Sequence, residues 1–209
     1  MNIESVPVGP FEANCVIAWD DQSRAVVFDP GDEAERLGRF LDERGLIPVA
    51  CMLTHGHVDH VSGVAALLSS RPAPVGLHPK DAVWAFEPAN RMPPCYEAPA
   101  RPKKIERSLA HGQKWTDGGL SYTVLETPGH SPGSVCFLFD DEGILVCGDT
   151  LFAGSVGRTD LPGGDARALQ ASLKRLADLP DDTMVYSGHG PVTSIGAEKK
   201  VNYFLRSCM

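Results

Sequence analysis

Apolar and polar positions alternate along the chain in a way that predicts a mixed α/β protein. In the first thirty residues, turn-forming residues separate three apolar stretches, which predicts the strands IESVPVG, NCVIAW and RAVVFD. Residues 33–45 place Leu37, Phe40 and Leu41 at helical spacing and end at Gly45, which predicts a helix. The continuous apolar run 47–53 is typical of a strand covered on both faces.

The remaining pattern repeats this order. It predicts a helix over 61–70 and another from about 165 to 178, in which Leu169, Leu173 and Leu176 are buried, and a last helix over 196–206. The further predicted strands cover 74–78, 120–128, 134–140, 143–149 and 183–190. Residues 87–104 contain five prolines and predict a long loop, which is either a wall of a substrate pocket or a surface connection. Two sheets packed face to face with helices outside satisfy this order, within one domain spanning 1–209.

Composition narrows the classes of partner. A net charge of −8, from 19 basic and 27 acidic residues, argues against nucleic acid or an anionic membrane as partner and leaves a small molecule. The N-terminus has no signal-peptide pattern, and no window approaches 18 apolar residues. The six cysteines include no Cys-x-x-Cys pair, so we expect reduced core residues and a cytoplasmic location. The sequence leaves the oligomeric state open.

Three of the seven histidines lie in one short motif, THGHVDH, directly after the apolar run 47–53. His55 and His57 are two residues apart, so in extended backbone their imidazoles can point the same way and share one cation. Asp59 and His60 follow, and offer a carboxylate and a third imidazole toward a second position. The alternative is that Asp59 caps a helix beside solvated histidines.

Other strand ends add similar side chains. His130 in TPGHSPGS and His189 in SGHGP each come just after a predicted strand, and Asp149 ends the apolar strand of LVCGD. A buried aspartate there must be paired or bound to a metal, because burying a bare charge costs several kcal/mol. The sequence therefore predicts a metal site at the strand ends.

The number of donors suggests two metals. Three imidazoles can bind one metal, and a second set of three ligands can bind another. One carboxylate then remains to bridge the two metals, with room for a bridging hydroxide. The first set is His55, His57 and His130, the second is Asp59, His60 and His189, and the bridge is Asp149. His78 and His111 fit no such pattern, and Walker, Rossmann and Gly-x-Ser-x-Gly motifs are absent.

With these motifs assembled, THGHVDH, TPGHSPGS, GDTLF and SGHGP resemble those of the metallo-β-lactamase superfamily. The resemblance implies an αββα sandwich of two similar halves, with the metals at one edge. It assigns the same ligand sets and the same bridge. Zinc is the expected metal, and iron or manganese also suits mixed His and Asp ligands.

Within that superfamily, GDTLFAGSVGRTDLPGGD resembles the small glyoxalase II-like thioester hydrolases, the hydroxyacylglutathione hydrolases. Full-length glyoxalase II carries a C-terminal helical domain that helps hold glutathione, and we expect none here because only twenty residues follow His189. The family's Lys and Tyr after GDTLF correspond to Arg158 and Asp160, and its usual Asn-Pro corresponds to Asn202 and Tyr203. The cation is retained and the phenol is not, which leaves the thiol moiety of the substrate open.

The resemblance implies a mechanism. The catalytic centre consists of His55, His57, Asp59, His130 and Asp149. A bridging water, its pKa lowered from about 15.7 toward about 7, attacks a carbonyl polarised by the first metal. The second metal takes the leaving thiolate. Arg158 either binds a carboxylate of the substrate or forms a structural ion pair with a neighbour such as Asp160.

Three other functions compete with this prediction. A persulfide dioxygenase of the same superfamily would use one iron, held by His55, His130 and Asp149, although LPGGD after GRTD favours the hydrolases. Lactone hydrolysis stays open, whereas a bridging Asp149 and GDTLF point away from β-lactam hydrolysis. A metal-stabilised binding module without activity is disfavoured by the complete set of seven ligands.

Overall fold

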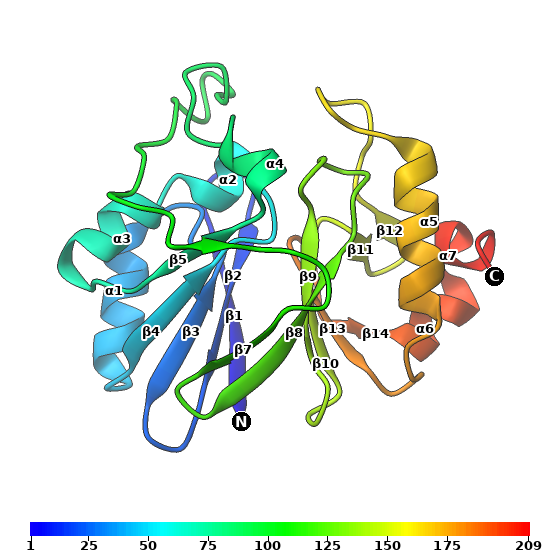
Figure 1. The fold of residues 1–209 in the computed structure, drawn as a ribbon, viewed down its shortest axis with the longest axis horizontal. Helices are drawn as coiled ribbons and strands as arrows, with labels where there is room; N and C mark the ends of the chain where they lie inside the picture. The colour runs from blue at the N-terminus through cyan, green and yellow to red at the C-terminus, as the bar shows by residue number, and fades with distance from the viewer.

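Two six-stranded sheets face each other in the centre of the molecule, and helices cover both outer faces (Figure 1). The computed structural model describes residues 1–209. In spatial order, the first sheet contains β1 (Asn2–Val8), β2 (Ala13–Trp19), β3 (Arg24–Phe28), β4 (Ile47–Met52), β5 (Val75–Leu77) and β6 (Arg107–Ser108). The second contains β14 (Thr193–Ser194), β13 (Met184–Ser187), β10 (Ile144–Gly148), β9 (Val135–Phe139), β8 (Leu120–Glu126) and β7 (Lys114–Asp117).

The helices divide between the two faces. α1 (Ala34–Glu43) and α3 (Val64–Ser70) lie on the outer side of the first sheet, and the short helices α2 (Val58–Val61) and α4 (Pro79–Ala82) lie at its upper end in Figure 1. The helices on the outer side of the second sheet are α5 (Ala166–Ala177), α6 (Ile195–Val201) and α7 (Tyr203–Arg206). A small hairpin of β11 (Leu151–Phe152) and β12 (Ser155–Val156) completes the structure. This is the predicted αββα sandwich. None of the helices combines the length and the apolar character needed to cross a bilayer.

Alternating side chains on the central strands account for the layers. In β4, Ala50 and Met52 belong to the cluster between the sheets, whereas Cys51 packs on the helical side. In β9, Phe137 and Phe139 face the other sheet, and Cys136 faces α5. β9 is therefore buried on both faces along its length, whereas β4 is so only from Ala50 to Met52, because Ile47 at its start is exposed.

Two predicted helices are interrupted, each for a visible reason. The helix predicted over 61–70 is divided between α2 and α3, because Gly63 N donates to Gly31 O (3.1 Å) instead of continuing the α2 ladder. The helix predicted over 196–206 breaks at Asn202, whose backbone is extended and whose side chain caps α7. The short elements β6, β7, β11, β12, β14 and α4 escaped prediction.

Strand directions decide where the loops meet. In the first sheet β3, β4 and β5 are parallel, so their carboxyl ends lie at one rim. In the second sheet β10 is parallel to β13, and β8 shares their direction because both β8 and β10 are antiparallel to β9. The loops after β4, β8, β10 and β13 carry the predicted ligands.

Candidate metal centre

The structure brings the seven predicted ligands to this rim, six of them in two groups of three and Asp149 between the groups. In the first group, His55, His57 and His130 each offer a ring nitrogen, and the three nitrogens lie within 4.8 Å of one another. His57 Nδ1 lies 2.8 Å from His130 Nε2. His55 and His130 are buried, whereas His57 is partly exposed. Two sheets contribute to this group, because the first two residues follow β4 and the third follows β8.

The second group contains carboxylate as well as imidazole. One ligand atom each from Asp59, His60 and His189 lies within 4.8 Å of the others. His189 Nε2 lies 3.3 Å from Asp59 Oδ2, and His60 Nε2 lies 3.7 Å from the same oxygen. His60 is fully buried, whereas the His189 side chain is 27% exposed. The site therefore opens toward solvent on the His189 side.

Asp149 lies between the two groups, and its Oδ2 is close to both. Its Oδ1 is 3.3 Å from His60 Nε2, and its Oδ2 is 3.4 Å from His130 Nε2 and 3.7 Å from His189 Nε2. The sequence predicts this bridging position.

The backbone and nearby side chains fix the tautomers of four histidines. His130 Nδ1 lies 2.8 Å from the carbonyl oxygen of Arg158, and His189 Nδ1 lies 3.0 Å from that of Phe11. A carbonyl oxygen only accepts, so each Nδ1 carries the proton and each Nε2 presents its lone pair to the site. His60 Nδ1 donates likewise to Asp29 Oδ2 (3.0 Å), and His55 Nδ1 to Thr54 Oγ1 (3.0 Å). Such partners orient metal-binding imidazoles in proteins.

The donor set fits divalent cations. Three buried atoms of the predicted ligands have no hydrogen-bond partner: His55 Nε2, His60 Nε2 and Asp149 Oδ1. An unpartnered buried polar atom costs about 1–3 kcal/mol, unless a ligand supplies the missing contact. Gly188 keeps this space open, because a Cβ there would collide with Asp149 Oδ1 and approach His60 Cε1 to 2.8 Å. Imidazole nitrogens and carboxylate oxygens are ligands of zinc, iron and manganese.

Charge differs between the groups. Burial, reinforced by His130, lowers the pKa of His57 to about 4. Burial alone would lower the pKa of His60 too, yet the carboxylates of Asp149 and Asp59 raise it well above its ordinary value. Burial would raise the pKa of Asp149, but His60 lowers it below the usual range of an aspartate. The two carboxylates of the site therefore lie at the second group and the bridge, where they favour the charged form of His60.

Two supporting residues were not predicted. Asp29 follows β3 with a left-handed backbone (φ 48°) and accepts from Thr54 N (2.8 Å) and Thr54 Oγ1 (2.6 Å) as well as His60. Asn14 donates from Nδ2 to the carbonyls of Ser187 and Gly190, both at 2.9 Å, and so holds the loop around His189. Asp29 had a sequence signal, since VVFDPG ends an apolar strand with a carboxylate as LVCGD does.

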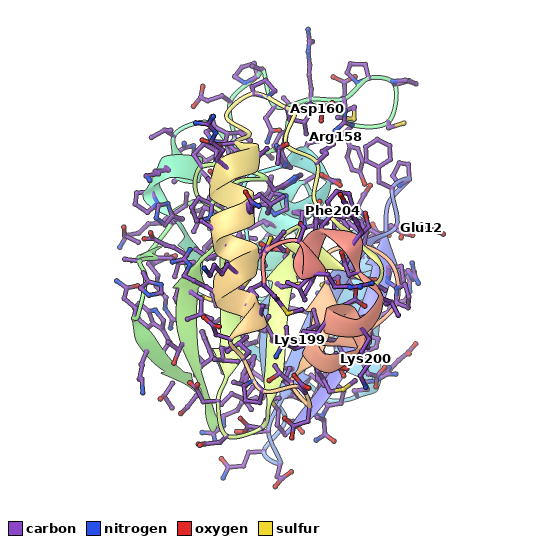
Figure 2. The ribbon with its side chains drawn as sticks, turned by 90° about the vertical axis from the view of Figure 1, so that its right-hand side faces the viewer. Glu12, Arg158, Asp160, Lys199, Lys200 and Phe204 are labelled. Carbon is purple, nitrogen blue, oxygen red and sulfur yellow. The ribbon has the colours of Figure 1, made fainter.

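Arg158 lies at the rim, but its side chain points into solvent. Its Nε and Nη2 donate to the two carboxylate oxygens of Asp160 at 2.6 and 2.7 Å, and both side chains are more than half exposed (Figure 2). The structure thus contains the ion pair that was one of the two predicted roles. The backbone carbonyl of Arg158 contacts His130, which places the residue beside the first group.

The hairpin β11–β12 forms the rim beside the second group. The ring centroid of Phe152 lies 6.0 Å from that of His189. Asn202 Nδ2 donates to the carbonyls of Phe152 (3.3 Å) and Ser155 (2.9 Å), and Gly154 N donates to Glu198 Oε2 (2.8 Å). The C-terminal helices therefore hold this hairpin through its backbone.

The proline-rich loop 87–104 is attached to the rim at two points. Asn90 Nδ2 donates to the carbonyl of Gly56, between His55 and His57, at 2.8 Å. Tyr96 is buried, and its ring packs edge-on against Phe11 at 5.3 Å. Of the six cysteines, all of which are free, four are buried, Cys208 is partly exposed, and Cys95 in this loop is exposed.

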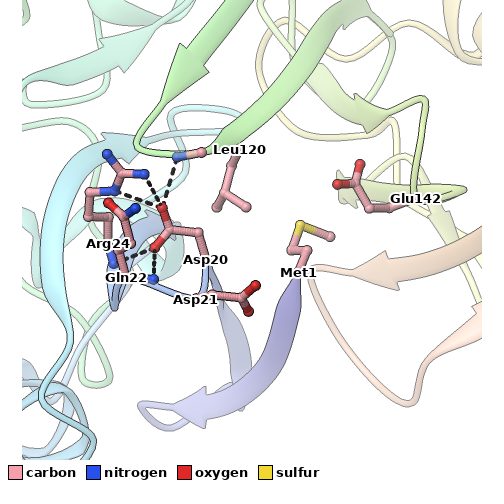
Figure 3. A pocket seen from close by; sticks show the side chains of 8 residues that line it. Met1, Asp20, Asp21, Gln22, Arg24, Leu120 and Glu142 are labelled. Carbon is pink, nitrogen blue, oxygen red and sulfur yellow. Dashed lines mark hydrogen bonds and ion pairs between the residues drawn. The ribbon is translucent and has the colours of Figure 1, made fainter.

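A pocket of about 270 Å³ at the β2–β3 turn contains none of these residues (Figure 3). Its Asp20 already accepts from Arg24 Nε (2.7 Å), Gln22 N (2.9 Å) and Gly119 N (2.9 Å). The rim is therefore the candidate centre of this molecule.

Comparison with known proteins agrees with the geometry of the rim. Residues 8–189 match the model of the metallo-beta-lactamase superfamily. The chain belongs to this superfamily. Its fold implies a dinuclear metal site, in keeping with the two groups of His and Asp side chains.

Individual relatives cover the whole chain. A hydroxyacylglutathione hydrolase, GloC of Haemophilus influenzae, is 37% identical, with 99% of each chain covered. The solved structure of the BLEG-1 B3 metallo-beta-lactamase is similar at a TM-score of 0.92 and 41% identity, covering 98% of this chain and 99% of the other. That of TTHA1623 in a di-iron-bound form has a TM-score of 0.85 and 42% identity, covering 96% and 99%.

Proposed function

We propose that this superfamily member is a two-metal hydrolase whose ligands are the seven residues at the rim. The position of Asp149 carries the proposal. Its carboxylate reaches both groups: Oδ1 lies 3.3 Å from His60 Nε2, and Oδ2 lies 3.4 Å from His130 Nε2 and 3.7 Å from His189 Nε2. A carboxylate in that position suits two cations better than one. A mononuclear iron site on His55, His130 and Asp149 would leave four side chains without a role: His57, Asp59, His60 and His189.

The protein residues prepare the site for hydrolysis. Two bound dications would lower the pKa of a shared water and polarise a substrate carbonyl. Asp29, Thr54 and the carbonyls of Phe11 and Arg158 hold four imidazoles in the tautomer whose Nε2 accepts a cation. His189 and Asp59 are the more exposed members of the second group, so we expect substrate to enter on their side.

We propose a thioester as substrate, such as a hydroxyacylglutathione. Support comes from the similarity to GloC at 37% identity over nearly the full length of both chains. Hydrolysis forms a C–O bond and breaks the C–S bond, giving a carboxylate and a thiol. A thiol has a pKa near 8.5, so thiolate leaves without a strong general acid. No such acid is needed in the site.

Arg158 is the proposed contact for a carboxylate of the substrate. Its partner Asp160 is exposed, and exposed ion pairs are weak enough to exchange for a ligand. In Arg158→Ala we expect KM for an anionic thioester to rise several-fold while kcat stays near the wild-type value, because only binding is lost. A neutral thioester of the same acyl group serves as control. An equal change in KM for the anionic and the neutral thioester would show that Arg158 does not bind the substrate carboxylate.

Beta-lactam hydrolysis is a second candidate, supported by the similarity to the BLEG-1 B3 metallo-beta-lactamase at 41% identity. Lactone hydrolysis would use the same centre. Both are tested beside the thioester with chromogenic substrates on the same protein preparation.

The first experiment is elemental mass spectrometry of untagged purified protein. We expect close to two metal ions per chain, as zinc, iron, manganese or a mixture; the di-iron form of the similar TTHA1623 makes iron a realistic occupant. A single iron per chain, with no second ion after zinc is added, would overturn the two-metal proposal in favour of the dioxygenase.

The second experiment measures thiol release from a hydroxyacylglutathione. We expect His60→Asn to lower kcat/KM at least 100-fold, because it removes one ligand and its contact with Asp149. His111→Asn is the matched control, since His111 lies outside both ligand groups. Full metal content without thiol release, together with β-lactam or lactone turnover, would keep the metal centre and reject the thioester.

A further inference from the structure

Asp81 in α4 is a fully buried carboxylate that belongs to neither ligand group. It has no lysine or arginine partner and is compensated by hydrogen bonds alone. Its Oδ2 accepts from Gly56 N (2.9 Å) and from Ser131 Oγ (2.5 Å), and its Oδ1 accepts from Gly133 N (2.7 Å). Removing a carboxylate from water costs free energy, so we expect this buried side chain to have a role.

The three donors belong to two different ligand loops. Gly56 lies between His55 and His57, in the loop that follows β4 of the first sheet. Ser131 and Gly133 follow His130, in the loop between β8 and β9 of the second sheet. A single side chain thus joins the two loops that carry the first group. Where they meet, His57 Nδ1 and His130 Nε2 are 2.8 Å apart.

The contacts require a carboxylate at this position. Two backbone N–H groups in fixed positions approach different oxygens of Asp81. Asparagine offers only one acceptor oxygen, so its amide NH₂ would face one of these N–H donors. The charged side chain satisfies both loops at once, which an amide of the same size cannot do.

Close packing leaves the loops little freedom to move relative to α4. A Cβ at Gly133 would lie 2.7 Å from Asp81 Oδ1, and one at Gly56 would lie 3.2 Å from Asp81 Cβ. The helix is itself anchored, because His78 Nδ1 accepts from Lys80 N (3.2 Å) and His78 Nε2 contacts Glu126 Oε1 (3.1 Å). Asp81 is therefore held from both sides.

The second group has different supports. His60 is held by Asp29, His189 by the carbonyl of Phe11, and the loop around His189 by Asn14. None of these hydrogen bonds involves Asp81. A change at Asp81 should therefore reach one group and not the other.

We propose that Asp81 is a positioning residue that sets the spacing of His57 and His130 and thereby the affinity of the first group for its cation. This rests on the ligand assignment of the proposed function. Loss of one supporting residue around a metal ligand typically costs about 10–100-fold in metal affinity. We expect a loss of that size at the first group and none at the second.

The test separates the two groups by single ligand variants. His189→Asn weakens cation binding at the second group, so the tight site that this variant retains is the first group. His57→Asn weakens the first group, so its tight site is the second group. Asp81→Asn is added to each, and zinc affinity is measured by competition with a chromophoric chelator. We expect a decrease of at least 10-fold in the His189→Asn background and less than 2-fold in the His57→Asn background. Cobalt(II) absorption spectra provide a readout of ligand geometry that does not depend on activity.

Controls cover folding and nonspecific loosening of the loop. Ser172→Ala removes a hydrogen bond to the carbonyl of Pro128 (2.8 Å), which supports the His130 loop from α5, and should leave zinc affinity unchanged in both backgrounds. If Asp81→Asn fails to fold by circular dichroism, Ser131→Ala replaces it. That variant keeps both N–H bonds to Asp81, and a several-fold loss confined to the first group is expected.

Equal losses in both backgrounds, or none in either, would overturn the role of Asp81. If wild-type protein binds two cations and Asp81→Asn binds them equally well, only this inference fails. If the wild-type protein itself binds no second cation, the two-metal function fails first.

Discussion

Two buried polar clusters in this protein are completed in opposite ways. At the rim, His55 Nε2, His60 Nε2 and Asp149 Oδ1 have no hydrogen-bond partner. At the edge strands β6 and β7, Arg107 donates two hydrogen bonds to Asp117, at 2.6 and 2.7 Å, and Tyr122 Oη donates a third at 2.5 Å. Both clusters join the two sheets, but only in the second are both carboxylate oxygens satisfied by protein donors.

The difference shows how to distinguish a structural polar cluster from a functional one. The edge cluster satisfies its carboxylate with protein donors, and Arg107 also stacks on Trp115 with its guanidinium carbon 4.4 Å from the ring centroid. Unpartnered buried atoms at the rim would destabilise the fold unless something else binds them. The stability of the rim should therefore depend on bound cations, and that of the edge cluster should not.

Removal of metal should have the largest effect. A cation present at 100 times its dissociation constant adds about 2.7 kcal/mol of stability, so two such sites add about 5 kcal/mol. We expect chelation to lower the free energy of unfolding by about this amount, measured by urea denaturation with and without added zinc. A difference below about 1 kcal/mol would mean that the unpartnered atoms do not destabilise the metal-free fold. The rim and the edge cluster would then not differ in their dependence on metal.

Asp117→Asn should come next. Removing one partner of a buried ion pair costs about 3–5 kcal/mol; we expect about 3 here, because the Arg107 side chain keeps 14% exposure. The loss should be equal with and without metal. Asp140→Asn, at an exposed aspartate that accepts from Thr123 Oγ1, is the matched control and should change stability by less than about 0.5 kcal/mol. A loss that metal reverses would contradict the independence of the two clusters.

Tyr122→Phe should have the smallest effect, about 1 kcal/mol at neutral pH for one lost hydrogen bond. Burial and Asp117 raise the pKa of Tyr122, so its contribution is present below the unfolded pKa of about 10 and is lost as pH rises above it. Between pH 9 and 11, wild-type protein should lose about 1.4 kcal/mol more than Tyr122→Phe. Parallel loss in both proteins, by urea denaturation at each pH, would exclude ionisation of this phenol.

The regular elements could be predicted because their signals are local. Leu169, Leu173 and Leu176 are buried at helical spacing as predicted, and the run 47–53 contains the strand β4, of which Ala50, Cys51 and Met52 are buried while Ile47 is exposed. Where prediction was wrong, a distant residue had intervened. The carbonyl of Gly31 interrupts the ladder at Gly63, and Asn202 leaves the helix in order to contact Phe152 and Ser155.

The sequence predicts the side chains that gather at the candidate site but not the residues that support them. The seven residues are His and Asp side chains in short motifs that follow apolar strands, so the sequence alone makes them recognisable. The structure brings these motifs together. Asn14 and Asp81 act on residues more than 20 positions away, and no local pattern distinguishes them from ordinary polar residues. Supports of this kind become visible only when the loops they join are placed in space.

The backbone contacts to the hairpin beside His189 bear on how this scaffold can diversify. Asn202 and Glu198 bind the carbonyls of Phe152 and Ser155 and the amide of Gly154, without using a side chain of the hairpin. Selection can therefore exchange the side chains at residues 152 and 155 while the main chain keeps its course. Libraries randomised at these two positions should yield folded proteins with altered substrate preference. Randomising Asn202 would instead remove the hydrogen bonds that hold the hairpin beside His189.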